Sequence, residues 1–402
     1  MTFPARLAIP DTVVRIARRL EEAGYETWCV GGAIRDTLLG LQNYDFDLTT
    51  AALPEQVQGL FRRTIPVGVE HGTVAVLDAN NQPHEVTTFR KDVQTDGRHA
   101  RVEFGVSLID DLARRDFTIN AIAYHPLRHD WRDPFHGEAD LERRLVRAVG
   151  DPNWRFQEDY LRILRALRFS ARFDFRIHRS TREAAQANVQ GLAQLSAERV
   201  RDEWFKGIVT ARRVSKLVTL WREIGATRIW LPEIGTRDLG RSARGGVVDA
   251  LPRDPVLVTA FLATDPASLL TRLKCANRDI ERGRAIRDWR DRYPDPDPRH
   301  VGEVRRWLSQ VGPAAEDLLV LHAAMHPRSA LPLVVASIRD AQDPLTLKDL
   351  AVHGDDLIAA GVRPGPDVGE MLQRLLADVL EDPTRNTREL LLGRVREWLK
   401  AA

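Results

Sequence analysis

The sequence predicts an α+β protein in which a mixed α/β head is followed by a long all-helical body. In roughly the first 125 residues, short apolar and β-branched runs alternate with segments of helical period. From about residue 141 onward almost every segment has helical period, and only 331–338 is ambiguous between helix and strand. The 402 residues are enough for about two to four domains.

The elements of the head follow from local patterns. Residues 11–23 carry an apolar stripe at helical spacing, with Asp11 as the expected N-cap and Gly24 as the stop. The segments that follow predict strands at 26–30, 44–49, 73–77 and 85–89 and helices at 35–39 and 53–61. In the body, proline and glycine clusters at 252–255, 294–298, 312–313 and 364–366 separate the helices.

Composition narrows the class of protein. The net charge of +2 and the 43% hydrophobic and 29% charged residues are typical of a soluble globular protein. The two cysteines, Cys29 and Cys275, are too few for a disulfide framework or a zinc cage and fit a reducing cytoplasm. The N-terminus lacks the layout of a signal peptide, and no apolar run approaches the roughly 18 residues of a membrane span. We therefore expect a cytoplasmic protein without a membrane partner.

A glycine pair, Gly31-Gly32, and two aspartates, Asp45 and Asp47, form the first chemical motif. A glycine pair at a strand-to-helix turn lets main-chain N–H groups approach phosphates. Two aspartates one residue apart on a strand point to the same face and offer Mg²⁺ the hard oxygen ligands that it prefers. Together they suggest metal-assisted nucleotidyl transfer, although each motif alone is more often a bare turn or a solvated strand end.

Two arginine-rich motifs come next. Arg114-Arg115-Asp116-Phe117-Thr118-Ile119-Asn120-Ala121 suits contact with a triphosphate, or is simply a charged helix start. In the segment 158–169, Asp159, Arg162 and Arg165 are spaced to share a helix face. A charge run of this kind is more often a solvated basic helix with its own ion pairs.

The order of the motifs gives them specificity. The glycine pair and Asp-x-Asp are followed by Val69-Glu-His-Gly-Thr-Val74, the 114–121 motif, Glu158-Asp159-x-x-Arg162 and Ala197-Glu198-Arg199. Over about residues 25–205 this series resembles the bacterial class II tRNA nucleotidyltransferases, the CCA-adding enzymes, whose close relatives are bacterial poly(A) polymerases. A weaker similarity continues in the tail at 354–358 and 364–369.

The resemblance implies a polymerase-β-like nucleotidyltransferase head at residues 1–140 and three helical domains. These are a neck for base recognition at 141–210, a body at 211–300 and a tail at 301–402, the last two binding tRNA. The implied activity is template-independent addition of CCA to tRNA 3′ ends from CTP and ATP, with release of pyrophosphate. No protein partner is implied.

The family pattern also assigns residues. Asp45 and Asp47 would be catalytic and hold two Mg²⁺ ions, Gly31, Gly32 and Arg35 would hold the triphosphate, and Arg115 would contact its phosphates. Asp159 and Arg162 would read the base, supported by Arg165 and Arg168, and Glu198 and Arg199 would brace the base-reading helix. Glu85 is a candidate third carboxylate near the metals or, equally, a partner of Arg90.

An aspartate–arginine pair can choose C and A without a template. Cytosine and adenine each present an amino donor beside a ring-nitrogen acceptor, whereas uracil and guanine present a carbonyl beside a ring N–H. A carboxylate only accepts hydrogen bonds and a guanidinium only donates them. Asp159 with Arg162 therefore matches C and A and leaves desolvated, unpaired groups against U and G.

Several alternatives stay open. The polar loop 91–101 has Arg98-His99-Ala100 where many relatives have Arg-Arg-Pro, and its presence favours full CCA addition through a switch from C to A. A CC-adding or A-adding specialist and a poly(A) polymerase are the nearest rivals. A non-catalytic RNA-binding protein is disfavoured because both aspartates are intact. His322 and His326 have the i, i+4 spacing of metal ligands but no acidic partner that completes a known pattern, so we expect an ordinary helix there.

Overall fold

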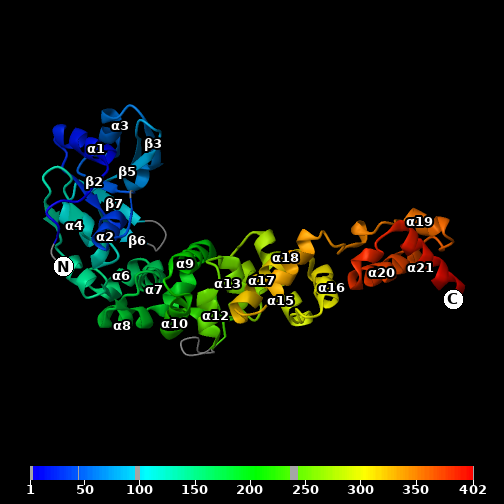
Figure 1. Cartoon of the computed structure of the whole chain (residues 1–402). Helices are drawn as coiled ribbons and strands as arrows, with labels where there is room; N and C mark the ends of the chain where they lie inside the picture. The colour runs from blue at the N-terminus through cyan, green and yellow to red at the C-terminus, as the bar shows by residue number, and fades with distance from the viewer. Residues whose placement is uncertain (1–2, 44, 96–99, 236–242, 402) are drawn as a thin grey trace. The chain divides into compact units, whose positions relative to one another are not determined.

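A computed structural model describes residues 3–43, 45–95, 100–235 and 243–401 (Figure 1). These residues fall into two compact units, one reaching residue 232 and one made of 233–235 and the residues from 243 onward. The first unit contains a sheet and the second is helical, so the predicted fold class is confirmed. No helix within the described ranges is long and apolar enough to cross a membrane.

The head is built on a mixed sheet with the strand order β3-β4-β5-β2-β1-β8-β9. β2 and β5 pair in parallel, and the other neighbours pair antiparallel. A separate antiparallel hairpin is formed by β6 and β7. The strand bounds are β1 Thr27–Val30, β2 Asp47–Thr50, β3 Thr64–Gly68, β4 Thr73–Leu77, β5 Pro83–Thr88, β6 Arg90–Thr95, β7 Ala100–Phe104, β8 Ala123–Tyr124 and β9 Trp131–Arg132.

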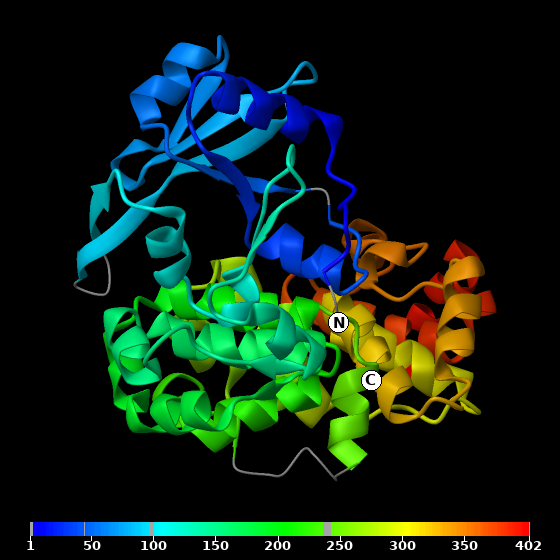
Figure 2. The ribbon, with the colours of Figure 1, turned by 90° about the vertical axis from the view of Figure 1, so that its left-hand side faces the viewer.

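Helices cover this sheet, and Figure 2 shows α1 lying across the strands of the head. Side chains of β1 alternate between two cores, because Cys29 joins one cluster while Trp28 and Val30 join another. The larger core also takes in Phe169 from a helix of the neck. The helices of the head are α1 Asp11–Glu22, α2 Gly32–Leu38, α3 Pro54–Leu60, α4 Leu108–Ala113 and α5 Gly137–Glu142.

The rest of the first unit is a helical neck. Its central helix, α7, packs against α9 and α10 and supplies arginines toward the head. The helices are α6 Pro152–Glu158, α7 Leu161–Phe173, α8 Arg179–Ala187, α9 Ala197–Thr210, α10 Val214–Ile224 and α11 Ala226–Trp230. A short parallel pair, β10 Leu145–Val146 and β11 Arg176–Ile177, also occurs here.

Among the described residues of the second unit, one hydrophobic cluster lies around α16 and α18 and another around α20. Leucine and valine side chains dominate both clusters, as the helical period predicts. The helices are α12 Ala243–Ala250, α13 Pro255–Leu262, α14 Pro266–Arg272, α15 Asn277–Arg292, α16 Val301–Val311, α17 Ala315–Met325, α18 Leu331–Asp340, α19 Gly354–Ala359, α20 Pro366–Glu381 and α21 Arg388–Ala401.

Four local expectations were wrong. Asp11 is the first residue of α1 rather than its cap, because Pro10 occupies the N-cap position. β2 begins at Asp47, so Asp45 precedes the strand instead of lying in it. Asp159 lies between α6 and α7 instead of on the same helix as Arg162 and Arg165. The parallel pair β10 and β11 lies in the region expected to be all helical, because strands of two residues are too short to show a period.

Candidate active site

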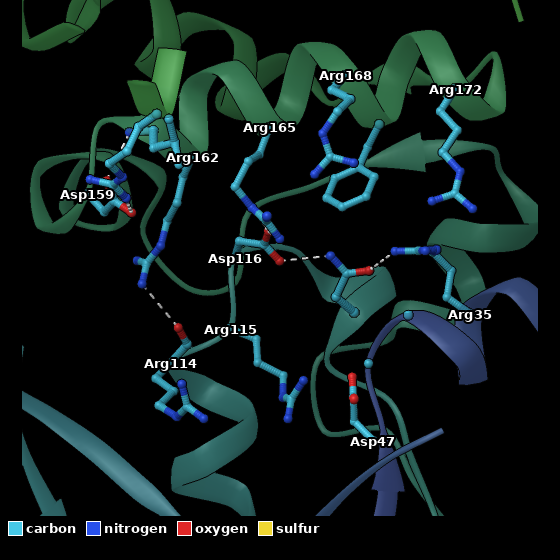
Figure 3. Close-up of a pocket in the computed structure, with 16 residues that line it drawn as sticks. Arg35, Asp47, Arg114, Arg115, Asp116, Asp159, Arg162, Arg165, Arg168 and Arg172 are labelled. Atoms are coloured by element: carbon cyan, nitrogen blue, oxygen red, sulfur yellow. Dashed lines mark hydrogen bonds and ion pairs between the residues drawn. The ribbon is translucent and has the colours of Figure 1, made fainter. Parts of the chain in front are cut away.

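Sixteen residues of the first unit line a cavity of about 530 Å³ (Figure 3). They come from the turn after β1 and from α2, from β2, from the chain after α4, from the link between α6 and α7, and from α7 and α9. Eight of the lining residues are arginines and three are aspartates, so the cavity suits a polyanion. Of the residues predicted to be catalytic or to bind nucleotide, all but Asp45 lie here: Gly31, Gly32, Arg35, Asp47, Arg115, Asp159, Arg162, Arg165 and Arg168. The candidate carboxylate Glu85 and the predicted bracing residue Glu198 are not among the lining residues.

The glycine turn brings main chain against the acidic strand. Val30 lies opposite Asp47 in the antiparallel pair of β1 and β2, which puts Asp47 beside Gly31. Gly31 has a φ of +79°, and a Cβ there would lie 3.2 Å from Arg115 Nη1 and 3.8 Å from Asp47 Oδ2. A side chain would be strained in this conformation and would crowd the Arg115 guanidinium. Glycine therefore leaves Asp47 and Arg115 open to the cavity.

Asp47 lies among other carboxylates. The pKa of Asp47 is raised to about 6, chiefly by burial and then by the charges of Glu85 and Asp45, while the charge of Arg115 opposes the rise. Glu85 is on β5, where Val86 lies opposite Leu48 of β2, so the same parallel register puts Glu85 level with Asp47. The protein thus only partly compensates this negative charge, and carboxylate oxygens are the ligands that hard divalent cations prefer. These residues fit the metal site that the sequence predicts.

Asp45 is the predicted catalytic residue that does not line the cavity. It is exposed, just before β2, and its main-chain N–H donates to Asn43 Oδ1 at 3.0 Å. Its charge nevertheless contributes to the raised pKa of Asp47. The two aspartates are therefore electrostatically coupled, although only Asp47 faces the cavity.

Arg35 is buried in the wall of the cavity, with 3% of its surface exposed. Its guanidinium donates to Asp36 Oδ1 and to Asn120 Oδ1. It also lies over the rings of Phe169 and Phe173 of α7, 5.0 and 4.7 Å from their centroids. These contacts fix Arg35 in place and join α2 of the head to α7 of the neck.

Asp116 connects the head to the neck at the centre of the cavity. Its carboxylate accepts hydrogen bonds from Asn120 Nδ2 at 2.8 Å and from Arg165 Nε at 2.7 Å (Figure 3). Burial alone would raise the pKa of Asp116, but the charge of Arg165 and these hydrogen bonds outweigh it and hold the pKa below its ordinary value. Asp116 is therefore a buried anion rather than part of a simple charged helix start.

Asp159 and Arg162 have separate partners. Asp159 Oδ2 accepts from Arg199 Nη2 at 2.8 Å, and its Oδ1 accepts from the N–H of Leu161 at 3.0 Å. Arg162 donates to Glu158 and to the main-chain carbonyl of Arg114. A carboxylate can accept about four hydrogen bonds and a guanidinium can donate five, so both groups keep capacity for a ligand.

The supporting arginines of α7 are held by acids. Arg165 pairs with Asp116, and Arg168 Nε donates to Glu203 Oε2 at 2.6 Å. Arg168 also lies over the ring of Phe169, 4.4 Å from its centroid. Both arginines line the cavity with their positions fixed from behind.

Sequence reasoning gave no role of their own to six residues that line the cavity: Arg114, Asp116, Asn120, Leu161, Phe169 and Arg172. Asn120 stands in the 114–121 motif but received no role. Arg172 follows Arg168 by one helical turn and pairs with Asp36 at 2.8 Å, so its spacing was a usable signal. Phe169 was hidden among the apolar residues of α7, because nothing in its spacing separates a cavity residue from a core residue.

The loop expected to switch between bases belongs to the β6–β7 hairpin. Arg90 pairs with Phe104 and Lys91 with Glu103 in this antiparallel ladder. Residues 96–99, which include Arg98 and His99, lie outside the described residues. Arg90 donates to the main-chain carbonyl of His71.

The fold and cavity define a nucleotidyltransferase head joined to a helical neck, and comparisons agree. Residues 27–147 match the poly A polymerase head domain. Residues 174–236 match a domain described as a probable RNA- and SrmB-binding site of polymerase A. Residues 326–395 match tRNA nucleotidyltransferase domain 2. The chain is 35% identical to the CCA-adding enzyme of Levilactobacillus brevis and 34% identical to that of Limosilactobacillus fermentum. These matches cover 95–96% of this chain and 96% of each relative.

Solved structures of CCA-adding enzymes also resemble this chain. The CCA-adding enzyme of Bacillus stearothermophilus in complex with CTP matches with a TM-score of 0.80 and 30% identity, over 97% of this chain and 98% of that one. The Thermotoga maritima CCA-adding enzyme complexed with tRNA shares the fold, with a TM-score of 0.66 and 20% identity, over 96% and 94% of the two chains. This chain therefore belongs to the family of CCA-adding enzymes and poly(A) polymerases and is a nucleotidyltransferase.

Proposed function

We propose that this chain adds CCA to the 3′ ends of tRNA from CTP and ATP, without a nucleic-acid template and with release of pyrophosphate. The observation that carries the proposal is the shared cavity, in which Asp47 and the glycine turn lie together with Asp159, Arg162 and Arg115. An acidic metal site, an arginine-rich phosphate surface and a base-reading pair thus border one space. The family relationship supports the same activity.

Asp45 and Asp47 are the proposed ligands of two Mg²⁺ ions, with Glu85 as a candidate third carboxylate. When bound, such ions activate the tRNA 3′-hydroxyl and stabilise the charge on the leaving pyrophosphate. The raised pKa of Asp47 supports this assignment, because a divalent cation would compensate the charges of Glu85 and Asp45.

Arg115 and the N–H groups of the Gly31-Gly32 turn are proposed to bind the triphosphate. Arg115 lies beside Gly31 and is also paired with Asp111, which orients its guanidinium. Arg35 contributes from the cavity wall, where Asp36 and Asn120 hold it rigidly. A fixed donor set orients the α-phosphate for attack and avoids the entropy cost of ordering long side chains.

Base choice is assigned to Asp159 and Arg162. Arg199 and the start of α7 hold the Asp159 carboxylate, so that its remaining lone pairs can accept the amino group of C or A. Arg165 and Arg168 support the nucleotide from the same helix, with Arg199 as the brace from α9. The carbonyl of U or G would face the carboxylate without a hydrogen bond, which is costly because Asp159 is only partly exposed to water.

The helical parts of the chain are proposed to hold tRNA by its backbone and shape. We assign this role to a body at 211–300 and a tail at 301–402, with the neck at 141–210 reading the base and the head at 1–140 carrying the chemistry. A tRNA substrate and the bacterial relatives support a cytoplasmic location. No protein partner is needed for this scheme.

The proposal is tested with tRNA that lacks its CCA end, Mg²⁺ and one labelled nucleotide at a time. CTP alone should add two nucleotides, and ATP alone should extend only tRNA that already ends in CC. Extension of any RNA by ATP alone would indicate the rival poly(A) polymerase. Arrest after two additions in the presence of both nucleotides would indicate a CC-adding specialist.

A further inference from the structure

A second cluster of titratable side chains belongs to the helical unit. His322 is on α17, His326 follows the last residue of that helix, and Asp295 is on the proline-rich connector between α15 and α16. Each of the three offers a ligand atom, and these atoms all lie within 4.8 Å of one another. They line a cavity of about 870 Å³ together with the turn after α17.

His322 is the key member of the cluster. It is 5% exposed, and its Nδ1 lies 2.6 Å from Asp295 Oδ2. An ionised carboxylate can only accept, so Nδ1 carries the proton of this hydrogen bond. The other ring nitrogen, Nε2, is buried and has no hydrogen-bond partner. A buried ring nitrogen without a partner is unusual, and in a neutral imidazole it carries a lone pair available to a ligand.

We propose that His322 and His326 bind a transition-metal ion of the zinc class, with Asp295 as the residue that positions His322. A carboxylate that accepts from one ring nitrogen while the other nitrogen binds the metal is a recurrent arrangement in zinc proteins. Zinc–nitrogen bonds of about 2.0–2.1 Å place two nitrogens of a tetrahedral site about 3.4 Å apart. The ring centroids of His322 and His326 are 4.9 Å apart, and His326 is exposed, so its ring can turn to bring a nitrogen to this distance.

The donor set selects the class of metal. Imidazole nitrogens favour zinc, cobalt, nickel and copper, whereas Mg²⁺ prefers carboxylates and water. With two protein nitrogens, the remaining positions are left to water, which reaches the site through exposed His326. The bound ion would tie α17 to its following turn and, through Asp295, to the connector that precedes α16. Asp295 is 27 residues from His322, which is why sequence spacing alone did not reveal an acidic partner.

The test is equilibrium binding of Zn²⁺ to the full chain by calorimetry, in millimolar Mg²⁺ so that the candidate active site is occupied. One Zn²⁺ per chain is expected, with a matching rise in melting temperature, because an ion that binds only the folded state stabilises it. Co²⁺ in place of Zn²⁺ should give visible absorption bands that report nitrogen coordination.

Three variants decide the assignment. His326→Ala removes an exposed ligand with little risk to folding and should abolish this binding event. Asp295→Asn keeps the size of the side chain and should weaken Zn²⁺ binding by about 10- to 100-fold. The matched control is His300→Ala, which removes an exposed histidine that makes no capping hydrogen bond at the start of α16. It should leave the affinity unchanged. Equal Zn²⁺ binding by wild type and His326→Ala would overturn the proposal, as would a loss of the same size in His300→Ala.

Discussion

The base-reading role of Asp159 can be tested by changing its hydrogen-bonding character without changing its size. Asp159→Asn replaces an obligate acceptor by an amide that can present either its oxygen or its NH₂ group. The oxygen still accepts from the amino group of C or A, while the NH₂ can donate to the carbonyl of U or G. We therefore expect UTP and GTP to be incorporated measurably, with a loss of discrimination rather than a uniform loss of activity.

The structure sets the size of this effect. An unsatisfied buried polar group costs about 1–3 kcal/mol. The side chain of Asp159 retains 25% exposure, so water partly relieves a mismatch and the lower part of that range applies. A change of about 1–2 kcal/mol corresponds to roughly a 5- to 30-fold shift in the ratio of kcat/KM for CTP over UTP.

The assay is steady-state kinetics with all four nucleotides on tRNA lacking its CCA end. Asp174→Asn is the matched control, because Asp174 caps the other end of α7 and also loses an ion pair, the one with Lys216 at 2.7 Å. Asp174 does not line the cavity, so the control should keep the wild-type ratio. An unchanged ratio in Asp159→Asn, or an equal shift in the control, would refute the assignment of base selection to Asp159.

Three further predictions follow from the site. Asp45→Ala or Asp47→Ala should abolish nucleotide addition and leave tRNA binding in a filter assay largely intact; turnover above about a tenth of wild type would contradict the metal assignment, since a lost metal should cost several kcal/mol. Deletion of residues 92–99 should leave CC addition working and stop A addition, because one pocket must be reshaped for a larger base; products that still end in CCA at the normal rate would make the loop a mere connector. The pKa of Asp116 lies below its unfolded value of about 3.9, so the ionised carboxylate stabilises the fold at neutral pH and this contribution disappears as the pH falls through the folded pKa. The free energy of unfolding of Asp116→Asn should therefore be well below that of wild type at pH 7, with a gap that narrows below about pH 4 in urea titrations; a gap independent of pH would contradict this reasoning.

The fold class could be read from the sequence because its two signals are long. Apolar periods repeat over whole helices. The glycine pair and Asp47 lie at the ends of β1 and β2, and the antiparallel pairing of these two strands brings them together. The short strands β10 and β11 were not predicted, because two residues each are too few to show a period. The start of β2 at Asp47 was missed because hydrogen bonding, rather than residue type, decides where a strand begins.

The partners of the site residues were harder to predict than the residues themselves. Motif order located Asp159 and Arg162 and predicted Arg199 as a brace. It did not predict the individual pairs of Asp159 with Arg199 and of Arg162 with Glu158, because these depend on how α9 and α6 pack against α7. The buried chain from Asp116 through Asn120 to Arg35 joins segments far apart in sequence. The pair of Asp295 and His322 could not be predicted for the same reason. The spacing of residues along the sequence gave His322 no acidic partner, and only the packing of the connector brings Asp295 to it.

We propose that the enzyme adds C, C and A in that order through one cavity and then stops. The most direct test of this proposal is sequencing of the 3′ ends formed when tRNA lacking CCA is incubated with the purified chain, Mg²⁺ and all four nucleotides at equal concentrations. Nearly all extended molecules should end in CCA, with no further additions. Long A tails, ends that stop at CC, or frequent U and G would contradict the proposal.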